Sequence, residues 1–190
     1  MAALQRGAAL VGLLILALWA GPALAAEDPE CLWRGFSDED RAIFMQDLSG
    51  AAPDPAKLRA LQTRTLEVMP GCGYRLEPGS VIRAGYGLVA VAHRTRALAA
   101  VANGETALPA AWEALPPEAR DSFRAITNAI VLRMNERPAA PSREVVDAAM
   151  ARGGLTGDQA LNVFAEYVLA ILLIDWLAAH PEQLQPPAGT

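Results

Sequence analysis

The stretch VFAEYVLAILLIDWLAA, at positions 163–179, decides the fold. Among its seventeen side chains only Glu166, Tyr167, Asp175 and Trp176 carry polar atoms. A helix that is apolar on nearly every side has to be surrounded by other elements of the protein. We therefore expect this stretch to form the central and most buried helix of an all-α fold.

Caps and breakers divide the rest of the chain into further helices. Ser37 and Asp40 have the spacing of a capping box, and Asp54-Pro55 has the pattern of a cap followed by a first-turn proline. The segment 81–92, VIRAGYGLVAVA, would also suit a pair of strands because it holds two glycines and three valines. Six helices are predicted, over 37–49, 55–69, 78–102, 116–137, 143–152 and 156–180.

An internal similarity favours the helical alternative for the third segment. It predicts that a three-helix unit of about 80 residues is repeated in tandem, over 31–103 and 110–180. The third segment is then the counterpart of the sixth. A chance similarity between two helices led by tryptophan is the other explanation. In the third helix, Gly85 and Gly87 would then permit a close neighbour. The matching residues are Trp33, Phe36, Glu39, Arg41 and Phe44 with Trp112, Leu115, Glu118, Arg120 and Phe123 at an offset of 79, and Gly73, Ala84, Tyr86 and Leu88 with Gly154, Ala165, Tyr167 and Leu169 at an offset of 81.

The two cysteines, Cys31 and Cys72, fit this arrangement. In an up-down-up unit, the start of the first helix and the end of the second lie at the same end of the bundle. An even cysteine count in an oxidising compartment predicts a disulfide between them, and this geometry would bring them together because Cys31 precedes the first predicted helix and Cys72 follows the second. The fold expected is a six-helix bundle, built as two tandem three-helix units and stapled by this one bridge.

The beginning of the chain predicts that compartment. Arg6 precedes an apolar run over 8–20, which is followed by the breaker Gly21-Pro22 and a small-x-small site ending at Ala25. This is the pattern of a secretory signal peptide, 1–25, cleaved after Ala25. The apolar run is short for a retained membrane anchor, the alternative, because a spanning helix needs about 20 residues. A periplasmic or secreted protein without a stable membrane anchor is expected, with a single domain over 26–185 and a flexible tail over 186–190.

The charge of the mature chain limits its partners. Loss of Arg6 with the signal peptide leaves 15 basic and 21 acidic side chains, a net charge of −6. Nucleic acids and anionic membrane surfaces both attract basic proteins, so neither is an expected partner. Another protein of the cell envelope is the expected partner. The sequence does not indicate an oligomeric state.

A low-ranked polar site is predicted around the third and sixth helices. It comprises His93, Arg94 and Arg96 in the most basic stretch of the mature chain, with Glu166 and Asp175 from the most apolar helix. The two acids are nine positions apart, which places them on opposite faces of a helix, so they cannot act as a carboxylate pair. At an offset of 81, Arg94 corresponds to Asp175, and a salt bridge between them is a further hypothesis.

The remaining polar residues have structural explanations. His180 ends the last helix, where a cation suits the helix dipole. The acidic run 38–40 suits a first helical turn, and it lacks the alternating oxygens, glycine and terminal glutamate of a calcium loop. No metal, cofactor or catalytic residue is predicted.

These observations favour a non-enzymatic module that binds another protein. In general layout the chain resembles periplasmic immunity and inhibitor proteins, although it matches none of their motifs. The alternatives are a carrier of a small hydrophobic ligand and a small secreted helical enzyme. The enzyme layout is similar to that of secreted chorismate mutases, which would imply that Lys57, Arg59, Arg64 and Arg124 bind a dicarboxylate.

Overall fold

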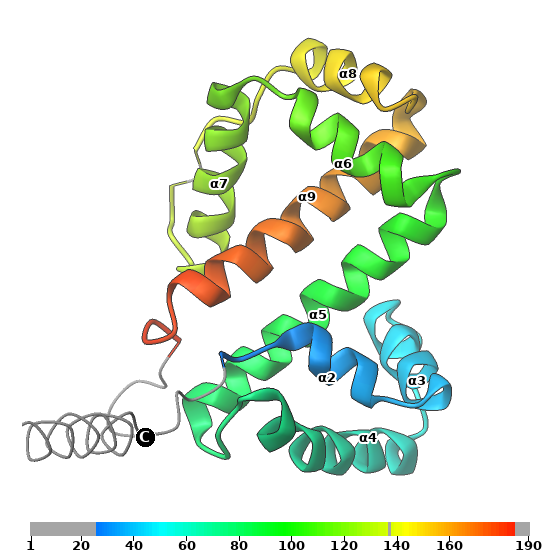
Figure 1. Ribbon diagram of the computed structural model, residues 1–190, viewed down its shortest axis with the longest axis vertical. Helices are drawn as coiled ribbons and strands as arrows, with labels where there is room; N and C mark the ends of the chain where they lie inside the picture. Colours follow the sequence, from blue (N-terminus) through cyan, green and yellow to red (C-terminus); the bar gives the residue numbers. More distant parts are fainter. Residues whose placement is uncertain (1–25, 137, 185–190) are drawn as a thin grey trace, which may run out of the picture.

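The computed structural model describes residues 26–136 and 138–184 (Figure 1). This described part of the chain holds eight α-helices and one short 3-10 helix, and no strand. The predicted all-α class is therefore confirmed, whereas the signal peptide over 1–25 and the tail over 186–190 lie outside the described residues. The elements are α2 (Pro29–Gly35), α3 (Asp38–Leu48), α4 (Pro55–Val68), η1 (Met69–Cys72), α5 (Pro78–Ala100), α6 (Gly104–Ala114), α7 (Pro117–Val131), α8 (Arg143–Arg152) and α9 (Gly157–Ala179).

The prediction of six helices was wrong because it missed α2 and α6. Asp28 caps α2 by accepting a hydrogen bond from the Glu30 amide at 2.9 Å, and Pro29 occupies the first turn. In α6, Pro109 lies inside the helix and removes one backbone donor. The helix persists because its Leu108 and Ala111 are fully buried in the core, and this packing outweighs the lost bond.

The fourth predicted helix is shorter than expected. It was predicted to reach position 137, but α7 ends at Val131. The Leu132 amide still donates to the Asn128 carbonyl at 2.9 Å, and Arg133 then takes a positive φ of 51°. A left-handed residue ends an α-helix, so α7 ends without needing Pro138.

Two helices of 23 residues each, α5 and α9, run antiparallel through the centre of the molecule (Figure 1). Helices α2 to α4 gather around one part of α5, and α6 to α8 gather around α9. The prediction that α9 is the most buried helix was wrong. Of their 23 described residues each, α5 buries ten and α9 seven, because much of the apolar surface of α9 is only half-covered.

The length and composition of α9 would also allow it to cross a membrane. A core helix of a globular protein passes the same test. α9 packs against α5, α6, α7 and α8, which covers part of its apolar surface.

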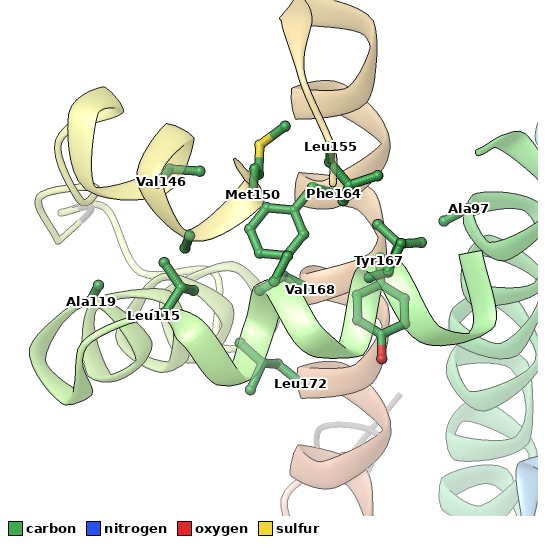
Figure 2. Packing of buried hydrophobic residues seen from close by; sticks show 14 residues of the cluster. Ala97, Leu115, Ala119, Val146, Met150, Leu155, Phe164, Tyr167, Val168 and Leu172 are labelled. Carbon is green, nitrogen blue, oxygen red and sulfur yellow. The ribbon is translucent and has the colours of Figure 1, made fainter. Parts of the chain in front are cut away.

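Two clusters of buried apolar side chains form the core. The cluster of the second half is centred on Phe164 of α9, which Figure 2 shows next to Met150 of α8 and Val168. It also takes in Ala97 from α5, while Ile174 of α9 packs against the cluster of the first half. Each long helix thus contributes to both clusters, which ties the two halves together.

The two halves repeat several local geometries, although the duplication itself stays a prediction. Trp33 lies edge-on to Phe44 with ring centres 6.0 Å apart, and Trp112 lies edge-on to Phe123 at 6.3 Å. The same turn follows η1 and α8. In both turns a glycine has a positive φ, and a methionine carbonyl accepts a hydrogen bond from the amide five residues later. The residues are Met69, Gly73 and Tyr74 in the first turn and Met150, Gly154 and Leu155 in the second.

The predicted disulfide between Cys31 and Cys72 is confirmed, with Cα atoms 5.5 Å apart. It joins α2 to η1 at the end of the first half where α5 begins. The close approach predicted at Gly87 is also present, since an added Cβ there would lie 2.7 Å from Pro29 Cβ. At Gly85 the prediction was wrong, because nothing lies within 4 Å of such an atom.

Candidate functional site: a groove at the junction of the two halves

The described part of the chain has a surface groove of about 910 Å³, which we call the junction groove. It lies where the segment before α2, the first turns of α5 and the last turns of α9 meet. Its walls combine prolines and apolar side chains of α9 with charged side chains of the first half. The groove is lined by Ala26, Glu27, Asp28, Pro29, Glu30, Gly73, Tyr74, Arg75, Glu77, Pro78, Gly79, Arg83, Ile174, Leu177, Ala178, Pro181 and Glu182.

An ion pair between the buried Arg83 and the half-buried Glu27 forms part of one wall. Arg83 is only 8% exposed, and its Nε and Nη2 donate to the two carboxylate oxygens of Glu27, both at 2.6 Å. The hydroxyl of the fully buried Ser80 donates to the same carboxylate at 2.5 Å. That hydroxyl accepts the Arg75 amide proton at 2.9 Å, which orients its own hydrogen towards Glu27.

The pair shifts the protonation equilibria of its members. Burial alone would raise the pKa of Glu27, but the hydrogen bonds from Arg83 and Ser80 and the nearby guanidinium charges together lower it. The hydrogen bond with Glu27 raises the pKa of Arg83, against the opposite effect of burial. Both groups are therefore charged at neutral pH, and the carboxylate loses its charge only in acid.

Tyr74 closes the same wall. Its side chain is 4% exposed, and burial raises the pKa of its phenol, with a further contribution from the charges of Glu27 and Asp28. The phenol therefore stays protonated and available as a hydrogen-bond donor. A Cβ added at Gly87 would lie 3.3 Å from the phenol oxygen, so the tyrosine is packed tightly against α5.

The predicted polar site is only partly assembled, and it lies outside the junction groove. His93 Nδ1 and Arg96 Nε of α5 both contact Glu166 Oε1 of α9, at 2.7 and 2.8 Å. These side chains are 31, 39 and 23% exposed, so the cluster is half-buried between the two long helices. It gives Glu166 the partners that a carboxylate in an apolar helix requires.

Arg94 and Asp175 do not join this cluster, and the predicted salt bridge between them was wrong. Arg94 Nη2 lies 2.5 Å from Glu30 Oε1, on the α2 side of α5, and Asp175 is exposed. The antiparallel arrangement explains the difference. Since His93 is opposite Glu166, Asp175 lies more than two helical turns further along α9.

A second cavity, of about 570 Å³, adjoins the end of α5. It is lined by Arg94, Thr95, Leu98, Ala99, Glu105, Pro109, Tyr167 and Ile171. Burial raises the pKa of Tyr167 at its edge. Arg94 in its lining pairs with Glu30, which lines the junction groove instead, so no ion pair has both of its members in this second cavity and the junction groove is the stronger candidate site.

The basic residues that the chorismate mutase layout would require do not converge. Lys57 pairs with Glu39, Arg64 with Glu67 and Arg124 with Asp121, all on the surface. Arg59 is exposed. His180 caps α9 as predicted: its amide donates to the Trp176 carbonyl at 3.0 Å and its ring stacks on the indole at 4.7 Å.

Within 26–136 and 138–184, no group of three or more His, Cys, Asp or Glu side chains could hold a metal ion. Comparisons with protein families, curated proteins and solved structures found no match. Sequence reasoning missed Glu27, Ser80 and Arg83. Arg83 is the sole charged residue in 78–92, and a lone charge in an apolar helix was the signal that could have identified it.

Proposed function

We propose that this protein is an exported, non-enzymatic module of the cell envelope that binds a segment of another protein in the junction groove. The observation that carries the proposal is the groove itself, an open depression of about 910 Å³ whose wall contains the ion pair of Glu27 with the buried Arg83. Apolar pockets with a few fixed polar groups are the usual form of binding sites. The predicted signal peptide and the disulfide support the envelope as the location.

The composition of the walls supports a peptide as the ligand. Ile174, Leu177 and Pro181 offer apolar contacts, whereas Tyr74 and Arg83 offer polar ones. A polypeptide segment carries both kinds of group at short intervals along its chain. The exposed Leu76, between two groove residues, extends the apolar surface beyond the groove, since 66% of its area is exposed.

A site-specific photo-crosslink tests the proposal. A benzophenone amino acid replaces Ala178, an exposed alanine of α9 in the groove, in protein expressed in its own cells. The control places it at Ala151, an exposed alanine of α8 outside the groove. We expect one defined protein adduct from position 178 and none from position 151. Equal adducts from both positions, or none from either, would refute a groove-specific partner.

A carrier of a small hydrophobic molecule is the second candidate. The volume of the groove lies within the range of about 300–1,000 Å³ found for small-ligand sites, and α9 provides an apolar wall. Native mass spectrometry of the purified mature protein separates the two functions. A bound small molecule that Leu177→Glu removes would support the carrier, and a ligand-free protein that still forms the adduct at position 178 would support the peptide module.

A further inference from the structure

We propose that Ser80 and Arg83 form a carboxylate-binding site, which Glu27 fills in the free protein and the C-terminal carboxylate of a partner polypeptide fills in the complex. This inference rests on the function proposed above and names the group that the groove recognises. Its starting point is the number and direction of the donors. Three of them, two from Arg83 and one from Ser80, converge on a single carboxylate within 2.5–2.6 Å.

The donors are fixed before any ligand arrives. Ser80 and Arg83 are three residues apart on α5 and therefore share one face of the helix. Both are buried, and the Arg75 amide holds the Ser80 hydroxyl in place. A planar guanidinium that offers two parallel N–H groups matches a carboxylate better than any other side chain does. The site is thus a preorganised carboxylate receptor.

The occupant, in contrast, comes from a short extended segment. Glu27 precedes α2 and belongs to no helix. The backbone next to it is attached through the Asp28 amide, which donates to the Cys72 carbonyl at 3.1 Å. A side chain on such a segment can leave the receptor while α2, α5 and the disulfide stay in place.

The architecture itself does not require an ion pair at this position. At the offset of 81 that relates the turns at Gly73 and Gly154, Ser80 and Arg83 correspond to Leu161 and Phe164 of α9. Phe164 is fully buried in an apolar cluster, and Leu161 packs against it. Burying a charge costs free energy that an apolar side chain avoids. The charged pair of the first half is therefore better explained by recognition than by folding.

The shape of the groove favours a chain terminus over an internal side chain. On the α9 side the wall beyond the receptor is apolar, with Ile174 and Leu177 and then Pro181, whereas the rest of the lining also carries acidic side chains, namely Asp28, Glu30, Glu77 and Glu182. A C-terminal residue presents its carboxylate and its own apolar side chain from the same Cα atom, so it can satisfy both parts together. Capture of a terminal carboxylate by a fixed set of donors is a known mode of peptide recognition.

Because Glu27 is tethered, it competes at a high local concentration. Removal of its carboxylate should therefore increase the affinity for an external one. The experiment measures, by isothermal titration calorimetry at neutral pH, the binding of acetyl-leucyl-leucine and of its C-terminal amide to the mature protein and to Glu27→Ala. Glu27→Gln is the second variant in case Glu27→Ala folds poorly, and circular dichroism checks each fold.

We expect the free acid to bind both Glu27 variants at least about tenfold more tightly than it binds the wild type. The amide should bind at least about tenfold more weakly than the acid, because it cannot form the charge-assisted hydrogen bonds. Adding Arg83→Leu should abolish the preference for the acid. Equal binding of acid and amide to a folded variant, or no binding at millimolar concentration, would overturn the proposal. Octanoate is the third probe, and tighter binding of octanoate than of the peptide would assign the receptor to a lipid-type carboxylate instead.

Failure here is distinguishable from failure of the proposed function. If the adduct at position 178 persists in an Arg83→Leu variant, the groove binds its partner without the receptor, and only the carboxylate proposal falls. If the adduct disappears with Arg83→Leu and persists with Arg64→Leu, a surface arginine outside the groove, both proposals are supported.

Discussion

Replacing Glu27 with glutamine should destabilise the protein by about 2 kcal/mol at neutral pH. Breaking a buried ion pair costs about 3–5 kcal/mol when the remaining charge has no access to water. Here the Glu27 side chain is 22% exposed beside an open groove, so water can partly solvate Arg83. Glutamine also keeps one acceptor oxygen, and a bond to a charged group contributes about 1.5–3 kcal/mol. Both effects bring the expected loss below the fully buried limit.

Urea unfolding followed by circular dichroism at 222 nm measures this loss, since the described structure is helical. Glu39→Gln is the matched control because Glu39 pairs with Lys57 on the surface, where the two side chains are 72 and 54% exposed. Exposed pairs contribute about 0–1 kcal/mol, so the control should unfold close to the wild type. The midpoint should shift in Glu27→Gln without a change in slope.

The difference should also depend on pH in a defined direction. The pKa of Glu27 is lowered in the folded protein from its ordinary value of 4.5. The stabilisation is therefore complete above about pH 5 and is lost as the pH falls through the lowered value. Since a protonated glutamate resembles glutamine, the wild-type and Glu27→Gln curves should converge in acid. A difference below about 0.5 kcal/mol at pH 7, or one that grows in acid, would refute the assignment of Arg83 and Glu27 as a buried pair.

Three further predictions concern the fold. Replacing Cys31 and Cys72 with alanine should cost about 4 kcal/mol by the chain-entropy estimate for a separation of 41 residues, and a loss below about 1 kcal/mol in urea unfolding would contradict it. Gly85→Ala should raise the melting temperature, because alanine in an open helical position is about 0.5–1 kcal/mol more stable than glycine. Gly87→Ala should lower it, because the added methyl group would press on Pro29. A change in melting temperature of the same sign for both variants would show that this packing is wrong. Phe164→Ala should cost about 3–5 kcal/mol in the same assay, and a near-neutral result would remove Phe164 from the centre of its cluster.

Sequence patterns predicted those helices whose ends carry local chemistry. The capping box at Ser37 forms as predicted, with the Asp40 amide donating to the serine hydroxyl at 3.1 Å and the Asp40 carboxylate accepting from the Ser37 amide at 3.0 Å. The pairing of Cys31 with Cys72 followed from an even cysteine count in a chain with the pattern of an exported protein, although Cys31 lies within α2 and not before the first helix. Helices α2 and α6 were missed because one is only 7 residues long and the other contains a proline. Both depend on packing against helices distant in sequence.

The candidate site was harder to predict for a physical reason. Glu27 and Arg83 are 56 positions apart, and the polar stretch around His93 had a stronger composition signal. Composition does not reveal which of two charged residues the fold will bury. The hydrophobic periodicity of the third predicted helix could have placed Arg83 on the buried face with Ala84 and Gly87. Its partner Glu27 precedes the first helix, in a segment without a periodic pattern.

The position of the disulfide connects the stability of the fold with the groove. Cys31 follows Glu30 and Cys72 precedes Gly73, so each half-cystine is next to a residue that lines the groove. The bridge therefore holds together the two backbone segments that carry Glu27 and Tyr74. In the second half the residue that corresponds to Cys72 is Gly153, so the turn after α8 keeps its shape without a bridge. Since that turn keeps its hydrogen bond without a bridge, we expect reduction of the Cys31–Cys72 disulfide to loosen the groove wall, and so to weaken the proposed binding at neutral pH, before the protein unfolds.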